Sequence, residues 1–320
     1  MISLFEIFIT FLFLFLSILY VIKKKWKKSL ALFLLFICIN SISETIAYNI
    51  LHTTTNDYDF RVLSYNIAHG DTNIVINNDK DIFDVIQEQN ADIVFLQEYK
   101  KKYYPELDSL LKNKYAYSIS EIVYSRYPVF NAYRIIPPKG DRNYMALSHK
   151  LYFPEYRKDY MIPAYSVNVN VKGSILHFVN CHLLTNNYSM AYRRYRKAQT
   201  NICSFFSEVY NGICFGSKSR ELQASYIKDD INQQVYPSLI CGDFNDMGTA
   251  KCIDILKDNN LYDCWWKNGI GYGNTLNMVF PKLRLDHILY NPDYLDCSTI
   301  RVVESKVSDH YPIVADFKLR

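Results

Sequence analysis

The chain has 320 residues, a formal net charge of +4 and a hydrophobic content of 49%. This length suffices for one large domain with an appendage or for two small domains, and the composition excludes a disordered or repetitive chain. Five lysines lie between positions 23 and 28, so the remainder is close to neutral and lacks the basic surface of a committed nucleic-acid binder.

Two apolar runs flank the lysine cluster Lys23–Lys28. The first, Ile2–Ile22, is long enough to cross a bilayer, and its positive charges follow it, which is typical of a retained anchor rather than a cleavable signal peptide. The second, Leu30–Leu51, is either a second span or an interfacial helix. Because lysines in short loops stay in the cytoplasm, two spans, which we favour, place the rest of the chain outside it. We therefore expect residues 1–51 to form a membrane anchor with one or two transmembrane helices, residues 52–59 a linker and residues 60–320 an extracytoplasmic domain.

Strand-like and helix-like periodicities alternate along the remaining chain. Strands are expected at Arg61–Ile67, Asp92–Leu96, Tyr115–Val123, Ser125–Val129, Met145–Tyr152, Tyr165–Val171, Ile175–Cys181, Leu239–Cys241, Arg284–Tyr290 and Tyr311–Leu319. Helices are expected at Asp81–Gln89, Glu106–Leu111, Met190–Val209, Glu221–Ile231 and Thr249–Lys257. The stretch Asn211–Arg220 is expected to be a loop that contributes to substrate choice.

The strand at Leu239–Cys241 ends in the sequence Gly242-Asp243-Phe244-Asn245. Gly242 lets the backbone leave the sheet where a side chain would collide. Asp243 and Asn245 lie two residues apart, so both side chains point the same way if the backbone is extended. A carboxylate and an amide aimed together suit a metal-bound phosphate and its attacking water. Taken alone, the motif fits a polar turn after a core strand equally well.

Further polar residues collect at the ends of other predicted strands. They are Asn66, Glu98, His182, Asp286, Asp309 and His310. Asn66 and Glu98 end two strands joined by a predicted crossover helix, so we expect those strands to be parallel neighbours. Such a collection is how a β-sandwich builds a site at one edge.

The order of these motifs resembles the endonuclease/exonuclease/phosphatase superfamily, from about residue 60 to the end of the chain. The matching segments are Ser64–Ile67, Leu96–Glu98, Ser125–Pro128, Cys181–Leu183, Gly242–Asn245, Arg284–Leu289 and Ser308–Pro312. The resemblance implies an α/β fold, a four-layer α/β/β/α sandwich, here preceded by the N-terminal transmembrane helices. The membrane-anchored layout is most similar to bacterial members of the family, which implies the bacterial inner membrane.

The resemblance also implies chemistry: hydrolysis of phosphoester bonds with Mg²⁺ or Mn²⁺. Hard divalent cations prefer oxygen ligands, and the residues that match family ligands are Asn66, Glu98 and Asp309. The residues that match catalytic positions are Asp243, Asn245, His310, Asp286 and His182. Asp243 would accept a proton from the attacking water with Asn245 orienting it, and His310 would be polarised by Asp286. His182 would donate to a non-bridging phosphoryl oxygen.

Three functions remain open at this point. The first is a metal-dependent phosphodiesterase or nuclease, acting as a monomer. The second is a phospholipid or inositol-phosphate phosphoesterase, suggested by the short linker to the membrane. The third is an inactive binding module, against which stands the complete set of acidic, amide and histidine residues. Four other side chains are expected near the site or its substrate: His69 and His287 are expected beside the site, Arg126 fits a substrate phosphate or a carboxylate equally well, and Tyr144 could reach the phosphate.

Overall fold

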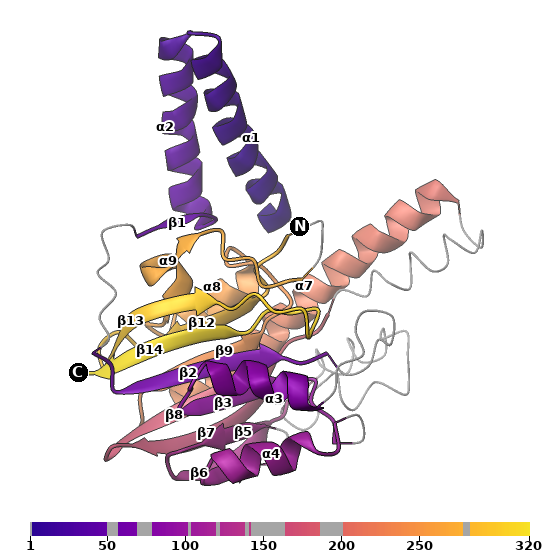
Figure 1. The fold of residues 1–320 in the computed structure, drawn as a ribbon. Helices are drawn as coiled ribbons and strands as arrows, with labels where there is room; N and C mark the ends of the chain where they lie inside the picture. The colour runs from indigo at the N-terminus through magenta and orange to yellow at the C-terminus, as the bar shows by residue number, and fades with distance from the viewer. Residues whose placement is uncertain are drawn as a thin grey trace.

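The computed structural model describes residues 2–49, 57–68, 79–101, 104–119, 122–137, 141, 164–185, 201–277 and 282–320 (Figure 1). Over these residues the chain after the N-terminal helices forms two six-stranded sheets. Sheet I has the order β13 (Leu295–Val302), β14 (Ile313–Leu319), β2 (Phe60–Asn66), β3 (Ile93–Gln97), β5 (Val123–Ser125) and β4 (Tyr117–Ile119). Sheet II has the order β10 (Tyr262–Asp263), β12 (Asp286–Tyr290), β9 (Ser238–Asp243), β8 (Ser174–His182), β7 (Ala164–Val171) and β6 (Val129–Ile135).

The pairs β2–β3 and β8–β9 are parallel, and the other pairs within the two sheets are antiparallel. The parallel pair of each sheet therefore places the C-terminal ends of two strands side by side. Each of these pairs is joined through helix-containing segments, as parallel strands require. The expected parallel pairing of the strands that end in Asn66 and near Glu98 is confirmed.

An aromatic core holds the two sheets face to face. Phe178 of sheet II stacks on Phe95 of sheet I at 5.5 Å between ring centroids and meets Phe60 of sheet I edge-on at 6.3 Å, while Phe60 stacks on Phe317, its neighbour in sheet I, at 5.4 Å. All four rings are fully buried. Aromatic pairs of this kind contribute about 0.5–1.5 kcal/mol each beyond their burial.

Helices cover the outer face of each sheet. On sheet II, α7 (Ile202–Asn232) and α8 (Lys251–Lys257) pack Ile227 and Ile253 into a second core. On sheet I, α3 (Asp79–Glu88) and α4 (Leu107–Lys114) pack Ile82 and Leu107 into a third hydrophobic core. The expected sandwich of two sheets flanked by helices is confirmed.

Helix α7 corrects one expectation. The predicted loop Asn211–Arg220 is helical and joins two predicted helices into one of 31 residues. The helix continues through Gly212 and Gly216, although a glycine in a helix lowers its stability by about 1 kcal/mol. Buried contacts outweigh this cost: Arg220 is 1% exposed and donates from Nη1 to the carbonyl oxygen of Leu184 at 2.8 Å.

Other differences are local. The expected strand Ser125–Val129 is instead interrupted: Ser125 ends β5, Val129 begins β6, and residues 126–128 link them, because Pro128 lacks the N–H that a ladder needs. The expected strand Met145–Tyr152 and the first half of the expected helix Met190–Val209 lie outside the described residues. Strand β13 was not predicted.

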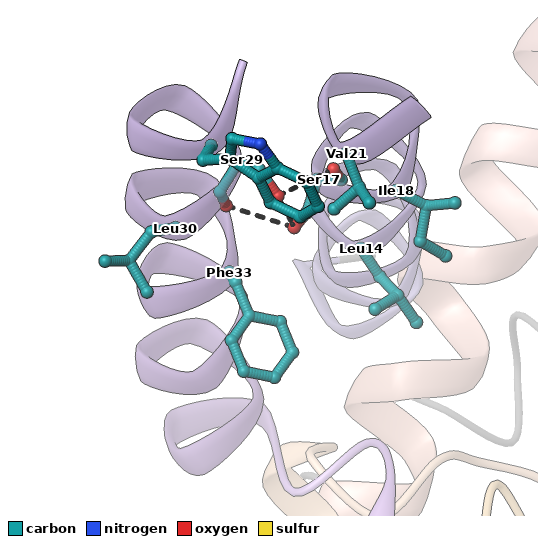
Figure 2. A pocket seen from close by; sticks show the side chains of 8 residues that line it. Leu14, Ser17, Ile18, Val21, Ser29, Leu30 and Phe33 are labelled. Atoms are coloured by element: carbon teal, nitrogen blue, oxygen red, sulfur yellow. Dashed lines mark hydrogen bonds between the residues drawn. The ribbon is translucent and has the colours of Figure 1, made fainter. Parts of the chain in front are cut away.

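The N-terminal helices α1 (Ile2–Ile22) and α2 (Trp26–Ser43) form a hairpin that projects from the sandwich (Figure 1). Ser17 Oγ donates to the carbonyl oxygen of Ser29 at 3.1 Å, and Ser29 Oγ donates back to that of Ser17 at 3.0 Å. Apolar side chains around this pair, with Trp26 and Phe33 among them, line a pocket of about 380 Å³ (Figure 2). None of the predicted site residues lines it.

The predicted membrane spans are not supported. Across the ranges that the structure describes, no helix combines the length and the apolar character needed to cross a membrane. The expected location outside the cytoplasm stays a prediction.

The hairpin contacts the sandwich beside sheet II. After α2, strand β1 (Ala47–Tyr48) pairs with β11 (Ile270–Gly271). Asn49 Nδ2 donates to the carbonyl oxygen of Gly269 at 2.9 Å, just beyond α9 (Cys264–Asn268), and Glu44 pairs with Lys257. The N-terminal segment is therefore attached to the domain by strand pairing, by a side-chain hydrogen bond and by an ion pair.

Candidate active site

The polar residues expected at strand ends gather at one end of the two sheets. Asn66 ends β2 and Glu98 follows β3, both in sheet I. His182 and Asp243 end β8 and β9 in sheet II, where they are register partners. Asp286 begins β12 and is paired with Asp243 from the other side. The site is thus divided between the two sheets.

Gly242 allows β8 and β9 to approach at this point. Its φ is +142°, and a Cβ atom built on it would lie 1.9 Å from the carbonyl oxygen of Cys181, its register partner. Any side chain would collide with the neighbouring backbone. The glycine therefore lets the two strands stay paired as far as His182 and Asp243; the sequence motif predicted that a side chain would collide here, but not that these two residues are neighbours.

Glu98, His182 and Asp243 form a first cluster. His182 Nε2 lies 3.6 Å from Glu98 Oε1 and 3.6 Å from Asp243 Oδ2. Asn66 Nδ2 donates to both carboxylates, at 3.2 Å to Glu98 Oε1 and 2.9 Å to Asp243 Oδ2. Asn66 Oδ1 accepts from the main-chain N–H of Ala68 at 3.0 Å. Asn66 orients the carboxylates in this arrangement, and its role as a metal ligand stays a prediction.

Asp243, Asp286 and His310 form a second cluster, which shares Asp243 with the first. His310 Nδ1 donates to Asp286 Oδ2 at 2.8 Å, and His310 Nε2 lies 3.8 Å from Asp243 Oδ2. All three residues are at most 6% exposed. The predicted histidine–aspartate pair is therefore present, with its free nitrogen directed toward Asp243.

Burial and neighbouring charges shift the pKa values of this cluster. Burial raises the pKa of Asp243, partly offset by the positive charge on His310. Burial alone would lower the pKa of His310, but the carboxylates of Asp286 and Asp243 outweigh it and raise that pKa well above its usual range. A carboxylate with a raised pKa is a better proton acceptor, and His310 stays protonated at neutral pH.

Asn245 and Asp309 occupy different positions relative to the clusters. Asn245 donates to Asp243 twice, from its main-chain N–H to Oδ1 at 2.8 Å and from Nδ2 to Oδ2 at 3.2 Å. It thereby fixes the Asp243 carboxylate. The Asp309 carboxylate accepts from Ser308 Oγ at 3.4 Å, and burial raises its pKa. It lies outside both clusters.

Two supporting residues were not predicted as part of the site. Thr275 Oγ1 accepts from the main-chain N–H of Asp286 at 3.1 Å, and its carbonyl oxygen accepts from Tyr311 N–H at 2.7 Å. Ser308 Oγ donates to the carbonyl oxygen of Asn66 at 2.8 Å and accepts from His310 N–H at 3.2 Å. The Ser-Asp-His motif contained a signal for Ser308, whereas nothing in the sequence marked Thr275.

The loop after Asp243 is held from both sides. The carbonyl oxygen of Asp246 accepts from His287 Nε2 at 3.0 Å, and its carboxylate binds Arg220 Nε at 2.8 Å. Arg284 Nη1 bridges Asp263 Oδ2 at 2.8 Å and His287 Nδ1 at 3.0 Å. His287 is a structural neighbour of the site, as expected.

Arg126 pairs with a carboxylate rather than facing the site. Its Nη1 donates to Asp92 Oδ1 at 2.9 Å, and its Nη2 donates to Asn90 Oδ1 at 2.6 Å. His69 and Tyr144 lie outside the described residues.

The donor set fits a divalent cation. One ligand atom each from Glu98, His182 and Asp243 lie within 4.8 Å of one another, and so do those of Asp243, Asp286 and His310. Asp286 Oδ1 is buried and has no hydrogen-bond partner among the described residues. Carboxylate oxygens are the ligands that Mg²⁺ and Mn²⁺ prefer. Glu98 and Asp243 would hold the cation, with His182 beside them.

Comparisons with known proteins agree with this geometry. A sequence model described as the endonuclease/exonuclease/phosphatase family matches residues 63–310. No curated protein matches the chain significantly. A family protein from Bacteroides vulgatus is similar in structure, with a TM-score of 0.55 and 16% identity, covering 82% of this chain and 99% of its own. The human Nocturnin catalytic domain with bound sulfate anion has a TM-score of 0.54 and 14% identity, covering 86% and 100%. A mannosyl-6-phosphatase from Bacteroides thetaiotaomicron has a TM-score of 0.50 and 16% identity, covering 81% and 99%.

Proposed function

The chain belongs to the endonuclease/exonuclease/phosphatase family, and from this premise we propose that it is a divalent-metal-dependent hydrolase of phosphoester bonds. The observation that carries the proposal is the pair of clusters that share Asp243. One cluster supplies carboxylate ligands, and the other holds the His310 imidazole 3.8 Å from the same carboxylate.

Each residue has a role in this proposal. A bound Mg²⁺ or Mn²⁺ would neutralise the charge that grows on the phosphoryl oxygens. Asp243 holds the attacking water in line, while Asn245 fixes the orientation of the Asp243 carboxylate. His310, kept protonated by Asp286, donates a hydrogen bond to a phosphoryl oxygen, and His182, whose Nε2 lies 3.6 Å from Asp243 Oδ2, donates another.

For the substrate class, we propose a phosphodiester and therefore a phosphodiesterase of the nuclease type. A phospholipid or inositol-phosphate phosphoesterase is the alternative, because the near-neutral domain lacks the charge of a committed nucleic-acid binder. Among solved structures of this fold, one is named as a mannosyl-6-phosphatase, so a phosphomonoester belongs in any substrate screen. A monomeric state and a location outside the cytoplasm stay predictions. The predicted location can be tested with alkaline phosphatase fused after Thr55, which would be active only outside the cytoplasm.

The test is hydrolysis by the purified full chain. Bis(p-nitrophenyl) phosphate, p-nitrophenyl phosphate, DNA, RNA, phospholipids and inositol phosphates are assayed with Mg²⁺, with Mn²⁺ and with excess EDTA. We expect hydrolysis with either metal and none with EDTA. Asp243→Asn should lower turnover by about 10²–10⁴-fold, whereas Asp293→Asn, a matched change of an exposed acid in a turn, should not.

Two results would refute the proposal. Full hydrolysis in excess EDTA would exclude the metal-dependent mechanism. No hydrolysis of any of these substrates, together with tight binding of one of them, would favour the inactive binding module.

A further inference from the structure

A layer of three buried polar side chains crosses between the sheets directly beneath the site. Gln97, the last residue of β3, donates both amide hydrogens of Nε2: to Ser64 Oγ of β2 at 3.1 Å and to Asn180 Oδ1 of β8 at 2.7 Å. Asn180 Nδ2 donates back to the carbonyl oxygen of Leu96 at 2.9 Å. The hydrogen bonds that Asn180 makes with Gln97 and with Leu96 thus connect sheet II to sheet I.

Each member of this layer adjoins a residue of the site. Ser64 precedes Asn66 by two positions in β2, and Asn180 precedes His182 by two positions in β8. Side chains two positions apart in a strand share a face. Gln97 immediately precedes Glu98. The three side chains of the polar layer therefore lie next to residues of the site and help to fix the positions of those residues.

The geometry of the site depends on how the two sheets meet at this end. Glu98 belongs to sheet I, whereas His182 and Asp243, its partners in the first cluster, belong to sheet II. Farther into the sandwich the interface is apolar, and apolar contacts are not directional. Hydrogen bonds are directional, so the polar layer fixes the relative position of the sheets next to the site.

Glu98 also needs local support for its backbone. Its φ is +58°, a left-handed value that is unfavourable for a residue with a side chain. Gln97 is anchored on two sides: its carbonyl oxygen accepts from Ile67 N–H at 3.1 Å, and its side chain is bonded to Asn180. Anchoring the preceding residue holds Glu98 in this conformation.

We propose that Gln97 is a positioning residue that sets the distance between Glu98 on one sheet and His182 and Asp243 on the other, and thereby the affinity of the site for a divalent cation. The proposal rests on the metal-dependent function proposed above. Gln97 acts through these neighbours and does not itself touch the cation.

The hydrogen-bonding of Gln97 separates this role from a general contribution to stability. Its carbonyl oxygen Oε1 is buried and has no partner among the described residues. In Gln97→Met this unpaired acceptor disappears, while Asn180 Oδ1 and Ser64 Oγ each lose the donor that Gln97 supplied. The number of buried acceptors without this donor therefore rises by only one, so Tm should fall by no more than a few degrees while the support of Glu98 is lost.

The experiment compares the full chain with Gln97→Met and with a matched control. Mn²⁺ affinity is measured by electron paramagnetic resonance titration, turnover with bis(p-nitrophenyl) phosphate, and Tm by circular dichroism. The control is Asn168→Leu, which also removes a buried amide whose Oδ1 has no partner among the described residues. Asn168 lies between two β7 valines that face the core between the sheets, so its side chain is on the outer face of sheet II.

We expect Gln97→Met to raise the Kd for Mn²⁺ by about 10–100-fold, the usual effect of losing a residue that orients a ligand. Its Tm should stay within about 4 °C of the unaltered chain. Asn168→Leu should leave the Kd unchanged. Ser64→Ala, which removes one of the two acceptors of Gln97, should raise the Kd by a smaller factor.

The outcomes separate this proposal from the function on which it rests. An unaltered Kd and turnover in Gln97→Met, with normal Mn²⁺ binding by the parent chain, would overturn the positioning role alone. A fall in the Tm of Gln97→Met by more than about 4 °C would assign Gln97 to general stability and would overturn the positioning role. An equal rise of the Kd for Mn²⁺ in Asn168→Leu would do the same. Absence of Mn²⁺ binding by the parent chain would overturn the proposed function, and this proposal with it.

Discussion

Replacement of Asp286 by asparagine tests the role of the buried histidine–aspartate pair. Asparagine keeps the shape of the side chain and its contact with His310, but it removes the negative charge that lies 2.8 Å from Nδ1. Two opposite unit charges about 4 Å apart attract by about 4 kcal/mol at an effective dielectric constant of about 20. Each 1.36 kcal/mol corresponds to a factor of ten in rate. If the transition state needs the imidazolium that Asp286 stabilises, turnover should fall by about 10³-fold, within the range of general acid–base effects.

The pH dependence provides a second measurement. The carboxylates of Asp286 and Asp243 raise the pKa of His310 against the opposing effect of burial. In Asp286→Asn this pKa falls, so His310 loses its proton at lower pH and the alkaline limb of the kcat profile should move to lower pH. The assay is kcat with bis(p-nitrophenyl) phosphate between pH 5 and 10, with Tm as the control for folding. A variant that kept its turnover, or whose alkaline limb did not move, would refute the assignment of His310 as the protonated donor.

Three further changes test other parts of the structure. Glu98→Gln removes an anionic ligand and should raise the Kd for Mn²⁺ in a titration; an unchanged Kd would remove Glu98 from the ligand set. Gly242→Ala places a Cβ 1.9 Å from the carbonyl oxygen of Cys181, so little soluble protein should be recovered, and a well-folded variant would contradict the observed approach of the strands. Burial alone would raise the pKa of Asp263, but Arg284 and His287 lower it; Asp263→Asn should cost about 3–5 kcal/mol in urea unfolding at pH 7. Because a lowered pKa contributes stability above the unfolded value and loses it as pH falls, the difference between this variant and the parent should shrink below about pH 4, and a difference independent of pH would argue against the ion pair.

Sequence patterns predicted the elements that bury one continuous face. Strands β2, β7, β8 and β14 and helix α3 were found close to their true bounds, because alternating or helical periodicity reflects burial directly. The continuity of α7 was missed because residues 211–220 were expected to be a loop, and only the tertiary contacts of Arg220 show that the helix persists.

Five of the residues that the sequence proposed for the site, Glu98, His182, Asp243, Asp286 and His310, lie together in the structure, but their geometry could not be predicted. Asp243, Asp286 and His310 were placed together because their motifs have a fixed order along the chain, and the structure brings them into contact. Gln97 and Thr275 act through partners far away in sequence. A buried amide or hydroxyl looks the same in a sequence whether or not it has a partner, so their roles required the structure.

The position of β14 in sheet I has a consequence for how the protein is made. This strand lies between β13 and β2, so β2 pairs with residues that are synthesised much later than β2 itself. Until then one edge of β2 presents unpaired N–H and C=O groups, which are a template for pairing with another chain. Contacts of such large sequence separation also form slowly. Stalled or truncated chains that lack Ile313–Leu319 should therefore be inactive and prone to aggregate, since they have both an open β2 edge and a His310 that no strand holds in place.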